Sequence, residues 1–150
     1  MQDFTRVSDV MTKDVIHTIS EEASAFDAAR EMKNAKRGCL IIVKRGTPTG
    51  IVTERDLVQR VMAEGKSPSD VKVSEVMSCP LISVGSEALV GDAARIMCEN
   101  NIRRLPVMDG PLLVGMITVT DFARYLGKKS IDDPMLAAMS RASEELWQTA

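Results

Sequence analysis

The sequence predicts a mixed α/β (α+β) fold built from two copies of one half-size unit, because the chain repeats itself. Three short motifs recur in the same order along the 150 residues. They are GIVTERDL at 50–57 and GMITVTDF at 115–122, DAAR at 27–30 and 92–95, and SDVM at 8–11 with SEVM at 74–77. A repeat of this length indicates a pseudo-two-fold module, and we expect its binding sites between the two halves.

Within each copy, the order of signals is strand, helix, strand, strand, helix. An apolar and polar segment predicts the opening strand, and apolar residues at helical spacing predict the helix that follows. Two apolar runs separated by Gly and Pro predict a hairpin, and a helix begins after each Thr-x-x-Asp sequence. These elements are expected at 15–19, 26–35, 40–43, 51–52 and 56–62 in the first copy, and at 81–84, 89–100, 105–108, 113–117 and 121–126 in the second.

Cap and turn residues support these boundaries. Ser24 followed by Asp27 has the spacing of a capping box at the start of the first long helix. Gly and Pro at 46–50 predict the turn of the first hairpin, and the Asp-Gly-Pro sequence at 109–111 predicts the turn of the second.

The repeat divides the chain into a first motif at 1–64, a linker at 65–72, a second motif at 73–128 and a C-terminal extension at 129–150. Apolar residues of the extension recur at helical steps, which predicts a C-terminal helix. That helix either packs on its own module or contacts another protein chain. Its apolar face is formed by Ile131, Met135, Met139, Ala142 and Leu146.

The composition and net charge of the chain disfavour several classes of protein function. A net charge of −2 gives no general attraction to nucleic acid or anionic lipid, and no apolar run is long enough for a membrane span. Three cysteines without a Cys-x-x-Cys spacing indicate reduced thiols in the cytoplasm. His17 is the only histidine, so a zinc site or a catalytic histidine pair has little support. We expect a cytoplasmic protein that is not an enzyme, carries no metal or prosthetic group, and contacts neither membrane nor nucleic acid.

The Thr-x-x-Asp sequences carry the chemistry of a candidate site. Thr53 and Thr118 each lie where a strand ends and a helix begins, a position whose free N–H groups favour a phosphate. Asp56 and Asp121 follow one turn later, and a carboxylate can accept hydrogen bonds from two adjacent ribose hydroxyls. The same spacing is also a helix capping box, which needs no ligand. Both roles can coexist.

The chain resembles the CBS domain, the cystathionine β-synthase motif that pairs in tandem as a Bateman module. The resemblance covers residues 7–127, where Ser-x-Val-Met, Asp-Ala-Ala-Arg, a β-branched strand and Gly-x-x-Thr-x-x-Asp all occur twice. It implies two β-α-β-β-α motifs packed sheet to sheet, and the C-terminal helix expected from apolar spacing lies outside the resemblance. It also implies that adenine nucleotides or related adenosyl ligands bind in clefts between the motifs without chemical turnover, and that modules pair into homodimers through their helices.

The two copies differ in their basic residues. Arg103 and Arg104 stand at a strand start in the second copy, where in CBS domains a basic pair often reaches the ligand's phosphates. The aligned positions of the first copy hold Gly38 and Cys39. Because Arg binds phosphate bidentately and keeps its charge, we expect the cleft of the second copy to be the primary site. The alternative for the arginine pair is a solvated charge pair at a strand edge.

The resemblance assigns further residues to each cleft. In the primary cleft, two residues from the opposite copy hold the base through their backbone groups. The second cleft is either weaker, empty, or dependent on its own arginines for phosphate. The primary cleft comprises Val15, Ile16, Arg103, Arg104, Met116, Thr118 and Asp121, and the second comprises Arg37, Ile51, Thr53, Arg55, Asp56, Leu81 and Ile82.

Two function classes follow from the sequence. In the first, the protein senses an adenosyl ligand (AMP, ADP, ATP or S-adenosylmethionine), which shifts the orientation or order of the two motifs, and a separate effector protein responds in trans. In the second, the protein is a ligand-independent dimeric scaffold. A panel of adenosyl ligands that leaves the melting temperature unchanged would favour the scaffold.

Overall fold

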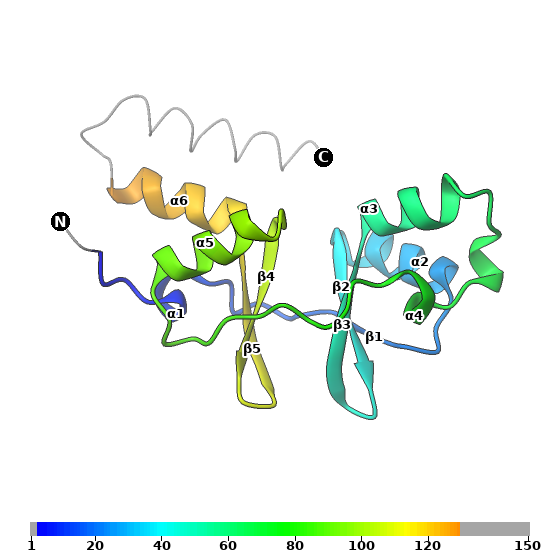
Figure 1. Ribbon diagram of the computed structural model, residues 1–150, viewed down its shortest axis with the longest axis horizontal. Coiled ribbons are helices and arrows are strands. Elements are labelled where there is room, and N and C mark those ends of the chain that lie inside the picture. Colours follow the sequence, from blue (N-terminus) through cyan, green and yellow to red (C-terminus); the bar gives the residue numbers. More distant parts are fainter. Residues whose placement is uncertain (1–2, 130–150) are drawn as a thin grey trace. The chain divides into compact units, whose positions relative to one another are not determined.

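The computed structural model describes residues 3–129, which form two compact units (Figure 1). The β1–β3 unit consists of Val15–Ile82, and the β4–β5 unit joins residues 3–14 to residues 83–129. Each unit has its own small sheet and its own helices, so the predicted mixed α/β class and the two similar halves are confirmed. The predicted C-terminal helix, and the contact assigned to it, lie from residue 130 onward outside the described residues.

The sheet of the β1–β3 unit has the strand order β1-β2-β3. β1 (Thr18–Ser20) runs parallel to β2 (Cys39–Lys44), and β3 (Thr47–Thr53) runs antiparallel to β2. β1 is shorter than the predicted strand and begins later. Val15 lies before it and is 77% exposed, so the start of the predicted strand has no sheet partner among the described residues.

The turn between β2 and β3 is shorter than predicted. Only Arg45 and Gly46 lie outside the two strands, and both have positive φ angles, of 50° and 78°. A two-residue hairpin turn with both central residues at positive φ matches the right-handed twist of the strands. Pro48 was predicted to lie in the turn but belongs to β3, opposite Val43, where the register shifts. An edge strand tolerates proline at such an irregularity because its outer N–H groups have no strand partner.

The helices α2 (Ala25–Ala35) and α3 (Glu54–Leu57) of the β1–β3 unit begin at the predicted caps. α2 follows Ser24, whose hydroxyl accepts a hydrogen bond from the Asp27 N–H at 3.0 Å, while Asp27 accepts one from the Ser24 N–H at 3.2 Å. The predicted capping box is therefore confirmed. α3 follows β3 and continues as a π-helical turn over Val58–Met62.

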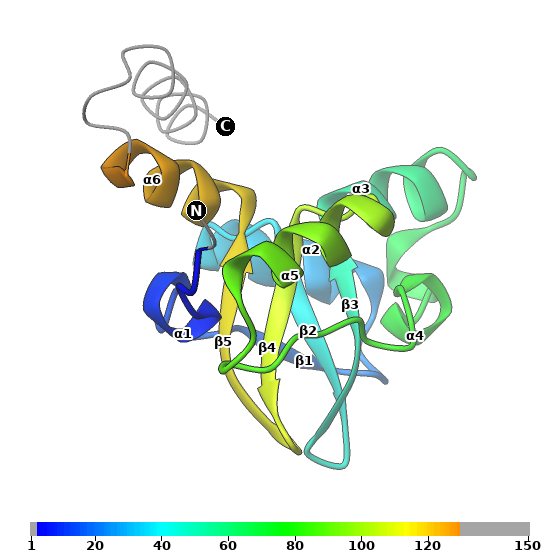
Figure 2. The same cartoon turned by 60° about the vertical axis from the view of Figure 1, so that its left-hand side comes forward.

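The β4–β5 unit repeats this plan with differences. β4 (Arg104–Asp109) and β5 (Leu112–Thr118) form an antiparallel hairpin, preceded by α5 (Val90–Glu99) and followed by α6 (Val119–Lys129). The N-terminal segment supplies α1 (Val7–Val10), which contacts α5 and α6 (Figure 2). Among the described residues no helix exceeds 11 residues, and none is long and apolar enough to cross a membrane.

The strand predicted at 81–84 does not form, and Pro106 explains why. In the β1–β3 unit, the Ile41 N–H donates to the His17 carbonyl at 3.0 Å at the start of the parallel pairing. The equivalent of Ile41 in the second copy is Pro106, which has no N–H to donate. The parallel pairing is thereby reduced to a single bridge between Val84 and Val107.

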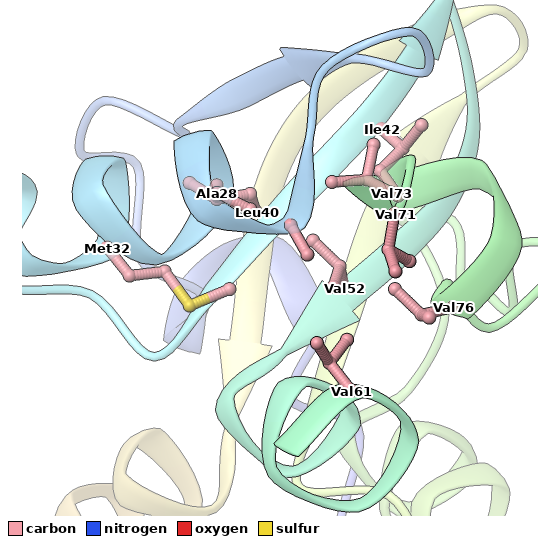
Figure 3. Packing of buried hydrophobic residues seen from close by; sticks show 10 residues of the cluster. Ala28, Met32, Leu40, Ile42, Val52, Val61, Val71, Val73 and Val76 are labelled. Carbon is pink, nitrogen blue, oxygen red and sulfur yellow. The ribbon is translucent and has the colours of Figure 1, made fainter. Parts of the chain in front are cut away.

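Each unit has a separate apolar core, and each core includes a segment from the other sequence repeat. Val73 and Val76 of the short helix α4 (Val73–Val76) belong to the second sequence repeat yet pack in the β1–β3 core, together with Val71 of the predicted linker (Figure 3). Val7 of α1 packs correspondingly in the β4–β5 core. Full burial of a valine contributes about 1.5–3 kcal/mol, so these exchanged segments contribute substantially to both cores. The two cores are formed by Ala25, Ala28, Met32, Leu40, Ile42, Val52, Val61, Val71, Val73 and Val76, and by Val7, Val84, Ala93, Met97, Leu105, Val107 and Ile117.

Candidate functional site

In the β4–β5 unit, the N-terminal segment passes directly over β5. Thr12 forms a two-way backbone bridge with Met116: the Thr12 N–H donates to the Met116 carbonyl at 2.8 Å, and the Met116 N–H donates back at 3.1 Å. The close passage requires glycine at the preceding position, because a Cβ on Gly115 would lie 2.6 Å from the Met11 sulfur and 3.0 Å from the Thr12 carbonyl oxygen. The crossing brings the Thr12 side chain to the end of β5.

The β1–β3 unit contains the same crossing. Ser78 forms a two-way backbone bridge with Ile51, with distances of 2.9 and 3.1 Å. A Cβ on Gly50 would lie 2.8 Å from both the Met77 sulfur and the Ser78 carbonyl oxygen. The repeated glycine of the Gly-x-x-Thr-x-x-Asp motif therefore has a packing role in both units.

Both Thr-x-x-Asp sequences form helix caps. At the start of α6, the Asp121 Oδ2 atom accepts hydrogen bonds from the Thr118 N–H at 2.8 Å and from its hydroxyl at 3.0 Å. At the start of α3, the Asp56 Oδ2 atom accepts the equivalent pair from Thr53 at 2.9 and 3.1 Å. The capping interpretation is confirmed at both positions. One carboxylate oxygen of each aspartate is thereby committed to the helix start, and the second oxygen determines what else the group can bind.

The second carboxylate oxygen has different partners in the two units. Asp121 Oδ1 accepts a hydrogen bond from the Thr12 hydroxyl at 3.0 Å and one from Arg124 Nη1 at 3.3 Å. Asp56 Oδ1 has an ion contact with Arg60 Nε at 3.8 Å, which is too long for a hydrogen bond. Sequence reasoning missed Thr12, Arg124 and Arg60.

The sequence contained a signal for the two arginines but none for Thr12. Arg124 lies three residues after Asp121, and Arg60 lies four residues after Asp56, so both are neighbours on one helix face. Thr12 is 109 residues from Asp121, and no local pattern connects them.

The arginine pair of the second repeat lies beside the cap of α6. Arg104 is the register partner of Thr118, and the Arg103 carbonyl accepts a hydrogen bond from the Val119 N–H at 3.1 Å. Gly38 and Cys39 occupy the equivalent places in the β1–β3 unit: Cys39 pairs with Thr53, and the Gly38 carbonyl accepts from the Glu54 N–H at 3.0 Å. The backbone around the cap, which we call the frame, is therefore similar in the two units. The β4–β5 unit differs in that two guanidinium groups are attached to this frame.

The remaining predicted residues are distributed unevenly between the units. All residues predicted for the second cleft belong to the β1–β3 unit. Of the primary cleft, Val15 and Ile16 belong to the β1–β3 unit, and the other predicted residues belong to the β4–β5 unit. Arg37 and Arg55 are exposed, Arg37 two residues before β2 and Arg55 in the first turn of α3. Within residues 3–129, no three His, Cys, Asp or Glu side chains are grouped closely enough to hold a metal ion.

Comparison with known proteins gives consistent matches. The model of the CBS domain matches residues 7–63 and 73–128. The CBS domain-containing protein YhcV of Bacillus subtilis is 37% identical over 117 residues, which cover 78% of this chain and 82% of YhcV.

Two solved structures are also similar along most of the chain. A hexameric CBS-CP12 protein from bloom-forming cyanobacteria superimposes with a TM-score of 0.73 and 31% identity, covering 97% of this chain and 95% of that one. The CBS domain pair of protein MJ0100, solved in complex with 5′-methylthioadenosine and S-adenosyl-L-methionine, superimposes with a TM-score of 0.75 and 28% identity. Its match covers 85% of this chain and 99% of that one.

Proposed function

The chain belongs to the CBS-domain family, and we propose that it is a regulatory protein that binds an adenosyl ligand and acts on a separate partner protein without chemical turnover. The observation that carries this proposal is the occurrence of the same Thr-Asp cap at a strand end in both units, next to a basic pair in one of them. The MJ0100 domain pair supports the ligand class, since its two ligands share an adenosine group.

The proposed contacts divide the ligand into two parts. Asp121 and Asp56 would accept hydrogen bonds from ribose hydroxyls, which every adenosyl ligand with an intact ribose offers. Arg103 and Arg104 would bind phosphate, which AMP, ADP and ATP carry and 5′-methylthioadenosine lacks. Thr118 would join them only by turning its hydroxyl hydrogen from Asp121 to the phosphate. The site that contains the arginine pair is therefore proposed to prefer a phosphorylated ligand.

Self-association is the second part of the proposal. We propose a homodimer as the smallest assembly, and the hexameric CBS-CP12 neighbour supports assembly of similar chains into oligomers. Exposed apolar side chains on α2 and on the π-helical turn, Phe26, Val58 and Met62, offer a surface for such a contact. Sedimentation of the purified protein measures the stoichiometry.

A thermal-shift panel tests the proposed function. AMP, ADP, ATP, S-adenosylmethionine and 5′-methylthioadenosine are each added to the purified protein, with GTP and ribose 5-phosphate as controls. A ligand at 100 times its dissociation constant should add about 2.7 kcal/mol of stability. We expect at least one adenosyl ligand to raise the melting temperature more than either control. A panel in which no adenosyl ligand does so contradicts the proposal, and a panel in which no ligand changes the melting temperature favours a ligand-independent scaffold.

A further inference from the structure

The carboxylate of Asp121 is already saturated by groups of the chain itself. Its Oδ2 atom accepts two hydrogen bonds from Thr118, and its Oδ1 atom accepts one each from Thr12 and Arg124. A carboxylate offers about four lone-pair sites, so four donors occupy it completely. The side chain is also buried, with 3% of its surface exposed. A ribose hydroxyl can reach this group only by replacing one of its present donors.

The equivalent carboxylate of Asp56, whose side chain is 10% exposed, accepts fewer hydrogen bonds from the chain. Its Oδ2 atom holds the same two hydrogen bonds from Thr53, but its Oδ1 atom has only the 3.8 Å contact with Arg60 among the described residues. The Arg60 guanidinium instead donates to the carbonyls of Val76 and Met77 at 2.8 and 3.1 Å. Ser78 occupies the place of Thr12 on the crossing segment, yet it is exposed and makes no hydrogen bond to Asp56.

We infer that Thr12 is a specificity-determining residue whose hydroxyl takes the position on Asp121 that a ribose hydroxyl would otherwise occupy. This inference rests on the proposed function, since it concerns the same two carboxylates. Of the four donors to Asp121, Thr118 is part of the helix cap and Arg124 is held on the same helix. Thr12 is therefore the donor that a ribose can replace at the lowest cost, because its side chain leaves the cap intact when it rotates away.

The consequence is a difference in ribose recognition between the two sites. At Asp121, the hydrogen bond gained from a ribose hydroxyl is offset by the bond lost to Thr12, so the net gain in affinity is small. At Asp56, no such bond is lost. The Asp56 site should therefore discriminate a ribonucleotide from its 2′-deoxy analogue more strongly than the Asp121 site.

Replacing the Thr12 hydroxyl by a methyl group tests the inference. Thr12→Val keeps the size and branching of the side chain and removes the competing donor. In an Asp56→Asn background, which leaves Asp121 as the only intact carboxylate site, we expect Thr12→Val to raise the affinity for the ribonucleotide about tenfold, the usual effect of one hydrogen bond to a charged group. The ratio of ribonucleotide to 2′-deoxynucleotide affinity should rise by a similar factor. Calorimetry with AMP and 2′-deoxy-AMP, or with whichever adenosyl pair the panel selects, measures both.

Two variants serve as matched controls. Thr12→Ser keeps the hydroxyl and should leave the affinity within about twofold of the unmutated protein, since its donor is retained. Ser78→Ala, made in an Asp121→Asn background, changes the equivalent position of the other unit and should leave the affinity of the Asp56 site unchanged.

The outcomes separate the inference from the proposed function. If neither site binds any adenosyl ligand, the proposed function is wrong. If ligands bind but Thr12→Val leaves affinity unchanged or lowers it, the function stands and the role of Thr12 is wrong. If Thr12→Val does not fold, a ligand-bound structure of the unmutated protein decides: a ribose hydroxyl on Asp121 Oδ1 with Thr12 turned away supports the inference, and a retained Thr12 hydrogen bond beside the ribose overturns it.

Discussion

The cap of α6 and the cap of α3 share one backbone frame but have different side chains around it. In both, a crossing segment bridges a strand beside a glycine, and the following Thr-Asp pair closes the first turn of a helix. The α6 cap adds a basic pair and a Thr12 donor, whereas the α3 cap has Gly38, Cys39 and an exposed Ser78 in their places. The two units thus share the groups that build the frame and differ in those that would contact a ligand.

Changes to the shared frame should therefore affect stability, and changes to the added side chains should affect ligand binding. The frame depends on a close backbone approach that any Cβ disturbs. The added groups lie at the edges of the frame, on the crossing segment and at the strand start, and the fold tolerates other residues at the equivalent positions.

The largest expected effect is on the frame, and it should differ between the two glycines. Gly50→Ala places a Cβ 2.8 Å from the Ser78 carbonyl oxygen, which is backbone and cannot move away without disturbing the bridge to Ile51. We expect the free energy of unfolding to fall by about 2–3 kcal/mol. Gly115→Ala should cost less, because its closest neighbour is the flexible Met11 side chain and the backbone oxygen is farther away, at 3.0 Å.

Urea denaturation of both variants measures this difference. Gly91→Ala is the matched control, because Gly91 lies on α5 with open space where its Cβ would be. Alanine favours a helix over glycine by about 1 kcal/mol, so this variant should be stabilised by up to that amount. If Gly115→Ala lowers the free energy of unfolding as much as Gly50→Ala, or more, the contact with the backbone carbonyl oxygen does not determine the cost.

A second prediction concerns the exchanged core segments. Val73→Ala and Val7→Ala each remove two methyl groups from a fully buried side chain and should each cost about 2 kcal/mol. Because Val73 packs in the β1–β3 core, its variant should lose hydrogen-exchange protection mainly in α2 and β2. Val7→Ala should lose protection mainly in α5 and β4. Loss of protection within the variant's own sequence repeat instead would show that the segments are not exchanged in solution.

The sequence predicted the local features of this comparison and missed the long-range ones. Capping boxes at Ser24 and at both Thr-Asp pairs depend on residues three apart, so their spacing alone indicated them. The lost strand at 81–84 depends on the absence of an N–H at Pro106, on a different strand. The Thr12 hydrogen bond to Asp121 joins residues that only the crossing segment brings together. Periodicity and spacing describe one element at a time, and neither contact lies within one element.

The exchange of segments between the cores was missed for a related reason. The sequence repeat begins at the Ser-x-Val-Met motif, which suggests that α1 and α4 belong to the motifs that follow them. Both helices are four residues long and carry no helical periodicity that would indicate which apolar surface they cover. Their destination is decided by the glycine crossings that come directly after them, where Thr12 bridges β5 and Ser78 bridges β3.

The smallest predicted change concerns the arginines added to the frame. Arg104 is the register partner of Thr118, so Arg104→Ala should weaken binding of a phosphorylated adenosyl ligand by about tenfold, or about 1.4 kcal/mol, the usual effect of one charge-assisted hydrogen bond. Arg55→Ala should weaken binding less, because Arg55 is exposed on the unit that lacks the basic pair. Binding of 5′-methylthioadenosine, which has no phosphate, should not respond to Arg104→Ala.

The matched control is Arg95→Ala, which removes the same charge from the same unit, where Arg95 pairs with Asp92 and Glu99 on α5. Calorimetry at two salt concentrations separates a direct contact from a general field, since screening weakens the effect of a distant charge on binding. Equal losses for Arg104→Ala and Arg55→Ala would show that the basic pair does not distinguish the two sites.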